Sequence, residues 1–253
     1  TYTRWAQDGL CNTTLTQSSG AWVVTVRPNF TSGTIASTGQ TICYGAGVTN
    51  SIGSTLAASG GNGTITYEWR ANGTPIPSSN AATYDPPDNL TTTTTYTRWA
   101  QDGLCNTTLT QSANTWVVTV RPNFTPGAIN TTGETICYNG NPNVIGSATP
   151  AIGGDNTITY EWRANGVAIP SSNTATYDPP ALTATTTYTR WAKDGTCNTT
   201  LTQSSGTWVV TVRPLFTAGQ IANTGQTICY GSGVTNSIGS TTLASGGDNT
   251  ITY

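Results

Sequence analysis

The sequence contains no histidine and no methionine, and Lys193 is the only lysine among its 253 residues. Histidine is the commonest general base and a common metal ligand, so its absence excludes a Ser-His-Asp site and weakens any metal site. No Cys-x-x-Cys pair is present to bind zinc. A single lysine also excludes a Lys–Asn isopeptide bond in every repeat. These absences predict no enzyme, no metal and no cofactor.

Charge is scarce as well. Charged residues make up 8% of the chain, against about 25% in typical soluble domains. The net charge is −2 and the basic residues are scattered, so we expect no nucleic-acid partner and no anionic-membrane partner. No run of 18 apolar residues occurs, which predicts no membrane span.

What the chain does contain is a long repeat. The stretch Thr-Tyr-Thr-Arg-Trp-Ala-x-Asp-Gly occurs at 1–9, 95–103 and 187–195, so its tryptophans are 94 and then 92 residues apart. A period of this length suits one small domain per repeat. Val-Arg-Pro, which recurs at 26–28, 120–122 and 212–214, marks the joints, because proline ends a strand ladder. The predicted divisions are a C-terminal part of a repeat (1–28), two complete repeats (29–122 and 123–214) and an N-terminal part of a repeat (215–253).

Both ends of the chain fall inside a repeat. The first residue is Thr1, and the last four residues match 64–67 and 157–160, where each earlier copy continues Glu-Trp-Arg. We expect the parent protein to continue at both ends. The lesser alternative is a subunit that exchanges strands with its neighbours.

Strand patterns fill each complete repeat. Ile65, Tyr67 and Trp69 alternate with polar residues, and Trp116, Val118 and Val120 do the same. Turn signals such as Asn72-Gly73 separate about seven such runs, and no 3.6-residue period is convincing. The sequence predicts an all-β fold of β-sandwich domains of about 92 residues each. The short, proline-ended links predict an extended rod.

Each complete repeat contains four motifs in a fixed order. In the first they are Gln40-Thr-Ile-Cys43, Ile65-Thr-Tyr-Glu-Trp69, the Tyr84–Thr91 turn and the Tyr96–Cys105 strand end, and the second repeats all four. Together these motifs resemble the immunoglobulin-like repeats of very large Bacteroidota surface proteins. The resemblance implies tandem immunoglobulin-like domains in adhesins or filament-like surface proteins. It also implies an extracellular location at the cell surface and export by type IX secretion.

The six cysteines form two classes. The early cysteines, near the start of a repeat, are Cys43, Cys137 and Cys229; the late cysteines, near its end, are Cys11, Cys105 and Cys197. One pairing joins Cys43 to Cys105 and Cys137 to Cys197, with Cys11 and Cys229 paired outside the chain. The other joins Cys11 to Cys43, Cys105 to Cys137 and Cys197 to Cys229. The resemblance favours the first, because a tryptophan between the cysteines packs on the bridge of an immunoglobulin-like sandwich. Either pairing implies an oxidising setting.

Six tryptophans are predicted to form the cores. They are Trp69, Trp99 and Trp116 in the first complete repeat, and Trp162, Trp191 and Trp208 in the second. Trp99 and Tyr96 are three residues apart, so in a regular strand they point to opposite faces, and only one of them can face the core. We expect Arg98 to pair with Glu68 on the outer face, and Arg190 with Glu161, which turns Trp99 and Trp191 inward.

The residues favour a structural or adhesive extracellular fibre segment without catalysis. Its expected partners are neighbouring repeats, identical chains in a fibre and an unidentified surface or glycan. One alternative is an array of carbohydrate-binding modules, in which exposed Trp5, Trp99 and Trp191 stack on sugars. Another is a filament that assembles laterally from many chains. Calcium binding by Asp85 with Asp88 or Asp102 is disfavoured, because carboxylates are few.

Overall fold

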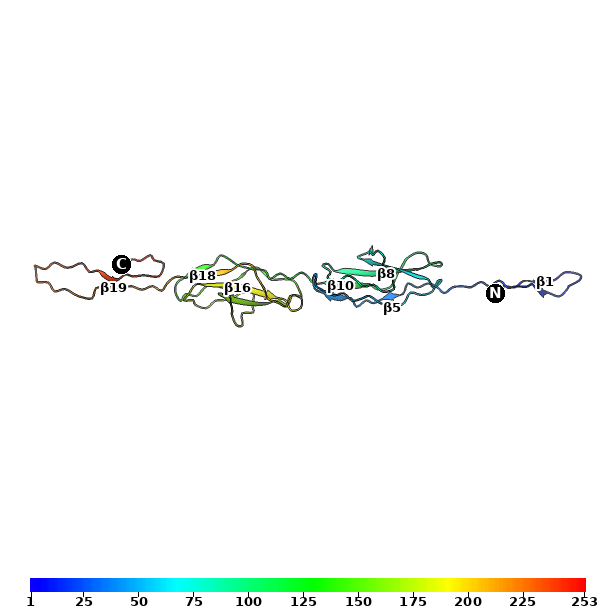
Figure 1. Ribbon diagram of the computed structural model, residues 1–253, viewed down its shortest axis with the longest axis horizontal. Helices are drawn as coiled ribbons and strands as arrows, with labels where there is room; N and C mark the ends of the chain where they lie inside the picture. The colour runs from blue at the N-terminus through cyan, green and yellow to red at the C-terminus, as the bar shows by residue number, and fades with distance from the viewer. The chain divides into compact units, whose positions relative to one another are not determined.

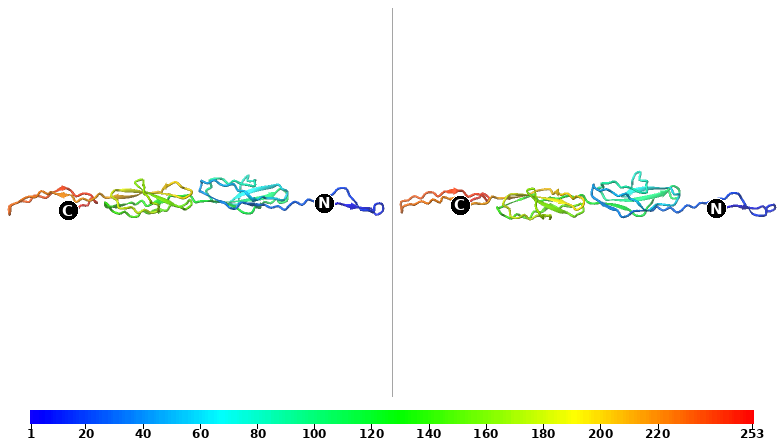
Figure 2. Two further views of the ribbon diagram at one scale, coloured as in Figure 1. Left: turned by 90° about the horizontal axis from the view of Figure 1, so that it is seen from below. Right: turned by 60° about the horizontal axis from the view of Figure 1, so that its bottom comes forward.

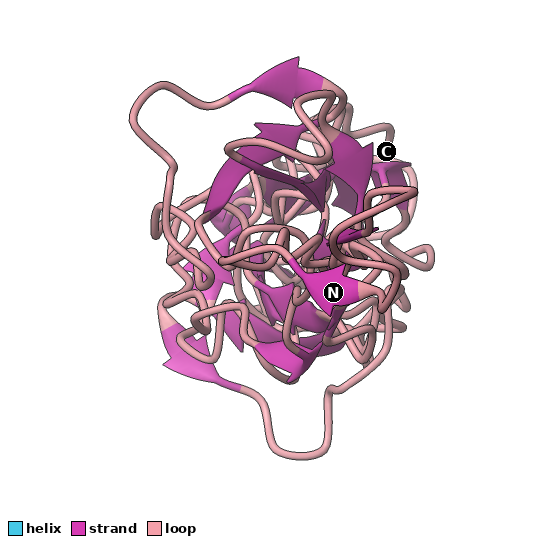
Figure 3. Cartoon of the chain, turned by 90° about the vertical axis from the view of Figure 1, so that its right-hand side faces the viewer, coloured by secondary structure: helices cyan, strands magenta, loops and turns pink.

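The computed structural model describes residues 1–253 and contains strands and loops but no helix (Figure 3). The chain forms two compact units, Thr1–Val120 and Arg121–Tyr253. Each unit contains one complete β-sandwich and one terminal segment with a two-stranded sheet. The all-β prediction is therefore confirmed.

The first sandwich consists of a larger and a smaller layer (Figure 1). Its larger sheet has the order β4-β10-β8-β6-β7, with β9 paired to β8, and its smaller sheet pairs β3 with β5. The strands are β3 (Thr34–Ile35), β4 (Gln40–Ile42), β5 (Ser54–Leu56), β6 (Ile65–Ala71), β7 (Thr74–Pro75), β8 (Thr94–Asp102), β9 (Thr110–Gln111) and β10 (Trp116–Val120).

The second sandwich repeats this topology. Its larger sheet has the order β12-β18-β16-β14-β15, with β17 paired to β16, and its smaller sheet pairs β11 with β13. The strands are β11 (Ala128–Ile129), β12 (Glu134–Ile136), β13 (Ser147–Thr149), β14 (Thr159–Ala164), β15 (Val167–Ala168), β16 (Thr186–Lys193), β17 (Thr202–Gln203) and β18 (Trp208–Val212). Within each sandwich the strands run along its length (Figure 2).

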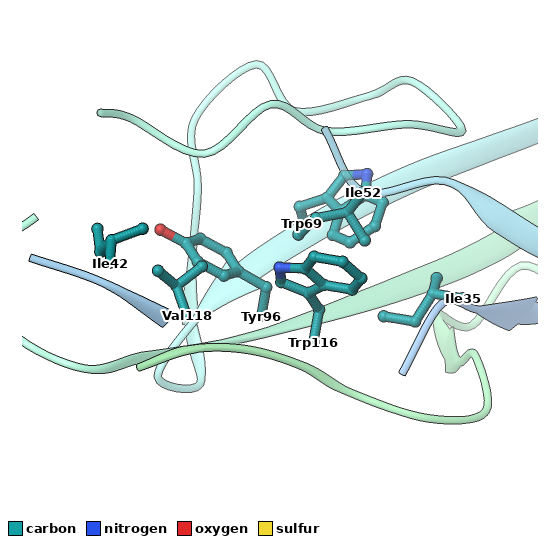
Figure 4. Packing of buried hydrophobic residues seen from close by; sticks show 7 residues of the cluster. All are labelled: Ile35, Ile42, Ile52, Trp69, Tyr96, Trp116 and Val118. Carbon is teal, nitrogen blue, oxygen red and sulfur yellow. The ribbon is translucent and has the colours of Figure 1, made fainter. Parts of the chain in front are cut away.

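The core lies between the two layers. Strand β8 alternates strictly between buried and half-buried residues, because successive side chains of a strand point to opposite faces. Trp69, Trp116 and Tyr96 of the larger sheet meet there with Ile35 of the smaller layer (Figure 4). The second core has Trp162, Trp208 and Tyr188 in the same places.

One pairing in each larger sheet is parallel. Ile42 of β4 lies opposite Val120 of β10, and Ile136 of β12 lies opposite Val212 of β18. All other strand pairs are antiparallel. An early strand and the last strand of each sandwich are thus hydrogen-bonded neighbours.

The terminal segments leave apolar side chains exposed. The N-terminal segment pairs β1 (Trp5–Ala6) with β2 (Thr16–Gln17), and the C-terminal segment pairs β19 (Gln220–Ile221) with β20 (Ser240–Thr242). Trp22 is 74% exposed, whereas Trp116, at the same place in the repeat, is 6% exposed. The difference arises because no second layer packs on the segment around Trp22.

Gly61 is required where a turn passes over the end of β8. Its φ is +56°, and a Cβ there would lie 2.2 Å from Oδ2 of Asp102. We expect Gly61→Ala to cost about 1–3 kcal/mol through backbone strain, with a further loss from displacing the carboxylate. Thermal unfolding of the first sandwich measures both.

Gly63→Ala is the matched control. Gly63 also has a positive φ, of +81°, but a Cβ there would meet nothing within 4 Å. Equal losses for the two variants would show that the contact with Asp102 is unimportant.

Candidate functional site

A buried arginine lies at the centre of each sandwich. Arg98 of β8 is fully buried. Its Nε donates to Oγ of Ser112 at 3.0 Å, and its Nη1 donates to the carbonyl of Ala82 at 2.9 Å and to the hydroxyl of Ser54. Nη2 donates to the carbonyl of Ser32 at 3.3 Å. Arg190 makes equivalent bonds in the second sandwich.

No carboxylate balances the charge of this arginine. Its Cζ lies 5.0 Å from the ring centroid of Tyr67 and 6.0 Å from that of Trp69, so aromatic faces and neutral acceptors replace water around it. Burial lowers the pKa of the Arg98 guanidinium below its ordinary value, while Tyr67 opposes that shift. The group is fully enclosed, so we interpret it as structural: it connects the two layers.

This placement corrects the predicted ion pair between Glu68 and Arg98. Arg98 lies directly opposite Trp69 in the antiparallel pair of β6 and β8, and directly opposed residues share one face of a sheet. Because Trp69 faces the core, Arg98 does too. Glu68 instead accepts from Nε of Arg70 on its own strand at 2.7 Å, and Glu161 pairs with Arg163 in the same way.

Trp99 and Trp191 lie on the outer face, which corrects their predicted place in the cores. Trp99 lies opposite Glu68 and is half-buried. Cζ of Arg70 lies 4.2 Å from the centroid of its ring, and Arg163 covers Trp191 at the same distance. Each indole therefore already has a cation stacked on it, which disfavours a free platform for sugars. The other four predicted core tryptophans, Trp69, Trp116, Trp162 and Trp208, are buried.

An aspartate shapes the loop that presents each late cysteine. Oδ1 of Asp102 accepts from the backbone amides of Leu104 at 2.8 Å and Cys105 at 2.6 Å. Asp194 holds Thr196 and Cys197 in the same way, and Asp8 holds Leu10 and Cys11. The Asp-Gly signal that indicated a turn thus fixes the backbone at the cysteine.

These hydrogen bonds make the loop sensitive to acid. Burial raises the pKa of Asp102, but backbone amides lower it by more, so the net pKa lies below the ordinary value. A depressed folded-state pKa stabilises the fold above the unfolded pKa of about 4, and this stabilisation is lost as the pH falls through the folded pKa.

We expect Asp102→Asn to destabilise the first sandwich at pH 7 and to flatten its loss of stability below about pH 4. Urea unfolding between pH 2 and 7 measures this. Asp85→Asn, at an exposed aspartate, is the control. An unchanged pH profile for Asp102→Asn would contradict the assignment.

The cysteines do not adopt either predicted pairing. Cys43 and Cys197 are each disulfide-bonded, whereas Cys11, Cys105, Cys137 and Cys229 are free and exposed. The predicted bridges from Cys43 to Cys105 and from Cys137 to Cys197 are therefore wrong, because Cys105 and Cys137 are free. The alternative pairing fails for the same reason.

The two cysteines of one repeat lie at opposite ends of its sandwich. Cys43 follows Ile42, which lies opposite Val120, whereas Cys105 follows the far end of β8. Thr94, near the start of β8, lies opposite Val118. The position of Cys43 and the position of Cys105 are therefore separated by about ten residues along β8, or about 30 Å. A disulfide requires Cα atoms within about 7 Å. The strand register that determines this separation is not apparent from cysteine spacing.

Other chemistry is sparse among residues 1–253. No three potential metal ligands lie together, and no helix has the length and hydropathy needed to cross a membrane. Asp88, considered above for calcium, accepts instead from the backbone amide of Thr49 at 2.7 Å. A hollow beside Phe30, Leu56 and Gln111 is lined by no ionisable side chain.

One family model matches a single stretch of the chain. A family described only as a domain of unknown function, DUF8696, matches residues 125–214. This stretch contains the second sandwich. No curated protein matches the chain.

Several solved structures of tandem domains are similar at low identity. Titin domains I67–I69 share 11% identity at a TM-score of 0.44, over 79% of this chain and 74% of that one. The fibronectin(III)-like modules of Clostridium thermocellum CbhA share 16% identity at a TM-score of 0.30, over 71% and 93%. Three N-terminal domains of the Hoc capsid protein of bacteriophage RB49 share 15% at 0.33, over 82% and 68%.

The assignment of an immunoglobulin-like sandwich rests on the strand pairing itself. Each complete repeat has two layers, a tryptophan core between them and a larger sheet of six strands. The chain is a tandem array of immunoglobulin-like domains. Its functional candidates are therefore the surfaces that each complete repeat reproduces.

Proposed function

We propose that the chain is a structural or adhesive segment of an extracellular surface fibre, without catalysis. The observation that supports this most strongly is the equivalence of the two complete sandwiches. Strand order, buried arginine, outer-face Glu-Arg-Trp group and aspartate loop all recur. A uniform array provides length and many identical surfaces, whereas a single ligand site requires one domain that differs.

Two features support an extracellular location. Disulfide-bonded cysteines persist in oxidising compartments, and the low charge leaves a neutral surface rich in threonine, serine and asparagine. We propose exposure at the cell surface, with neighbouring repeats and identical chains as partners. Export by type IX secretion and a Bacteroidota source belong to the same proposal and are supported by the sequence motifs alone.

Domain replacement tests the proposal. Beads coated with the chain are compared with beads coated with a variant whose residues 29–120 are replaced by a second copy of 123–212. Adhesion to surfaces and immobilised glycans should be the same for both, because the sandwiches are equivalent. Adhesion that disappears on replacement would show a site specific to one domain and would contradict the proposal.

Sedimentation of the purified chain tests fibre formation. A single species at all concentrations indicates that repeats act within one chain. Association that grows with concentration indicates contacts between chains. Glycan binding that Trp99→Ala abolishes in a folded chain would instead establish carbohydrate recognition.

A further inference from the structure

We propose that an open edge of the larger sheet pairs with the same edge of a second copy of the chain. The pairing residues are 65–67 of β6 in the first sandwich and their equivalents, 158–160, in the second. Each edge is a feature of one sandwich alone. The inference rests on the proposed function only in naming identical chains as partners, and it specifies the surface that they share.

The main-chain groups of Ile65 and Tyr67 point away from β8. Two residues further along β6, the amide of Trp69 donates to Oγ of Ser79 at 2.9 Å, and its carbonyl accepts from the amide of Ile76 at 2.8 Å, both on the side of β7. Alternate residues of a strand direct their main-chain groups to the same side. Ile65 and Tyr67 therefore face this side too, but β7 pairs only with the last two residues of β6. Their amides and carbonyls have no partner within the chain.

The second sandwich leaves the same edge open. The amide of Trp162 donates to Oγ of Ser172 at 2.9 Å, and its carbonyl accepts from the amide of Ile169 at 2.8 Å. Strand β15 pairs only with the last two residues of β14. A hollow of about 280 Å³ lies beside this edge, lined by Tyr160 and by residues 168–173. The hollow gives an added strand access to the edge at Tyr160.

A strained turn keeps each edge open. Ser78 has a φ of +59° and Ser171 a φ of +61°, a left-handed conformation that is unfavourable for residues other than glycine. After Ser78 the chain leaves the larger sheet and crosses to the segment before β5, where Tyr84 pairs with Ile52. The chain therefore does not continue along β6 to cover its edge.

The edge is complementary to itself when two copies run antiparallel. Tyr67 then lies opposite Ile65 of the second copy, and Ile65 opposite its Tyr67, and each opposed pair exchanges two main-chain hydrogen bonds. This register uses every free group of both edges. On the outer face, Thr66 lies opposite Thr66 of the second copy, and Glu68 lies opposite Thr64. No like charges are opposed, and a net charge of −2 causes little repulsion between two whole chains.

Amide-resolved hydrogen exchange on the full chain locates the contact. At low concentration the amides of Ile65 and Tyr67 should exchange fast, because they have no acceptor, whereas those of Thr66 and Glu68, which face β8, should be protected. A higher concentration should slow exchange at Ile65 and Tyr67 and at their equivalents in the second sandwich. Protection that grows only in the two terminal segments, or at no residue, would overturn the proposal.

Ile65→Pro combined with Ile158→Pro removes one free amide from each edge. Ile65 begins β6 and Ile158 precedes β14, and proline is tolerated where a strand begins and where its missing N–H faces no partner. Each sandwich should therefore stay folded. Sedimentation equilibrium should give a dissociation constant for self-association at least about tenfold higher than that of wild type, because each pairing loses main-chain hydrogen bonds.

Ile65→Ala combined with Ile158→Ala is the matched control. It removes the same side chains but keeps both amides, so the chain should associate as wild type does. Equal association of the proline and alanine chains would overturn the proposal.

A charge swap tests the same register through exposed side chains, and it does not require proline to be tolerated. Thr66 and Thr159 are exposed, so Thr66→Lys with Thr159→Lys should leave both sandwiches folded but place two ammonium groups opposite each other in each pairing. A chain with Thr66→Glu and Thr159→Glu has two carboxylates there. The two chains mixed should associate a few-fold more tightly than either alone. Thr119→Lys, exposed on the outer face of β10, is the control and should not change association. Mixing without a gain would overturn the proposal.

The edge and the proposed function can fail separately. Domain replacement leaves the edge in place, because both sandwiches have it, so adhesion that disappears on replacement contradicts the proposed function alone. Self-association that is unchanged in the Ile65→Pro and Ile158→Pro chain contradicts the edge alone.

Discussion

Trp69→Ala is expected to unfold the first sandwich at a temperature at which the second stays folded. Trp69 is fully buried; its Nε1 donates to the carbonyl of Ala81 at 3.0 Å, and its ring stacks on Tyr84 at 5.7 Å between centroids. Removing a buried tryptophan costs about 3–5 kcal/mol, a large share of the stability of one small domain. The expected fall in Tm is at least about 12 °C.

Calorimetry of the full chain checks this result, because each sandwich contributes its own transition. Trp162→Ala should shift only the other transition, since Trp162 holds the same place in the second core. Trp99→Ala is the control within the first sandwich, because Trp99 lies on the outer face and should cost about 1 kcal/mol or less. Equal effects of Trp69→Ala and Trp99→Ala would contradict the assignment of faces.

Arg98→Met has the second-largest expected effect. Methionine fills much of the space but donates no hydrogen bond. The carbonyl of Ala82 and the hydroxyl of Ser54 then lose a donor, at about 1–3 kcal/mol for each group left unsatisfied. The carbonyl of Ser32 keeps the hydroxyl of Ser112 as a donor at 2.7 Å. We expect a total loss of about 3 kcal/mol, seen as a lower urea midpoint for the first sandwich.

Arg70→Met provides the comparison. Arg70 lies on the outer face, where it pairs with Glu68 and stacks on Trp99. Its removal should cost about 1 kcal/mol or less, because partly exposed ion pairs and cation–π contacts are weak. Arg98→Met as mild as Arg70→Met would show that the buried network stabilises little.

Strand alternation was enough to predict the fold, but only part of the site. Period-2 patterns at Tyr67, Trp69 and Trp116 predicted β-strands with a tryptophan core, because burial on one face follows directly from the pleat. The buried face of β8 could not be predicted from alternation, because Tyr96 and Trp99 are both aromatic and point to opposite faces of the strand. General rules keep arginine outside, and here four acceptors without a carboxylate hold it inside. Predicting the buried face requires the register between β8 and β6, in which Trp69 lies opposite Arg98.

The cysteines show a different limit. Their spacing gave two pairings within and between repeats, and neither is formed. The missing information was that early and late cysteines lie at opposite ends of a sandwich, which depends on the parallel pairing of β4 with β10. This pairing joins residues about 80 positions apart in the sequence, and no local sequence pattern predicts it.

That parallel pair also determines how a domain would respond to tension along the chain. Because β4 and β10 run in the same direction and exchange hydrogen bonds over Gln40–Ile42 and Val118–Val120, pulling the two ends of the domain apart slides the strands past each other. The interstrand bonds are then loaded together in shear, whereas an antiparallel hairpin pulled from its open end breaks them one at a time. Each sandwich is therefore expected to resist stretching between its own two ends.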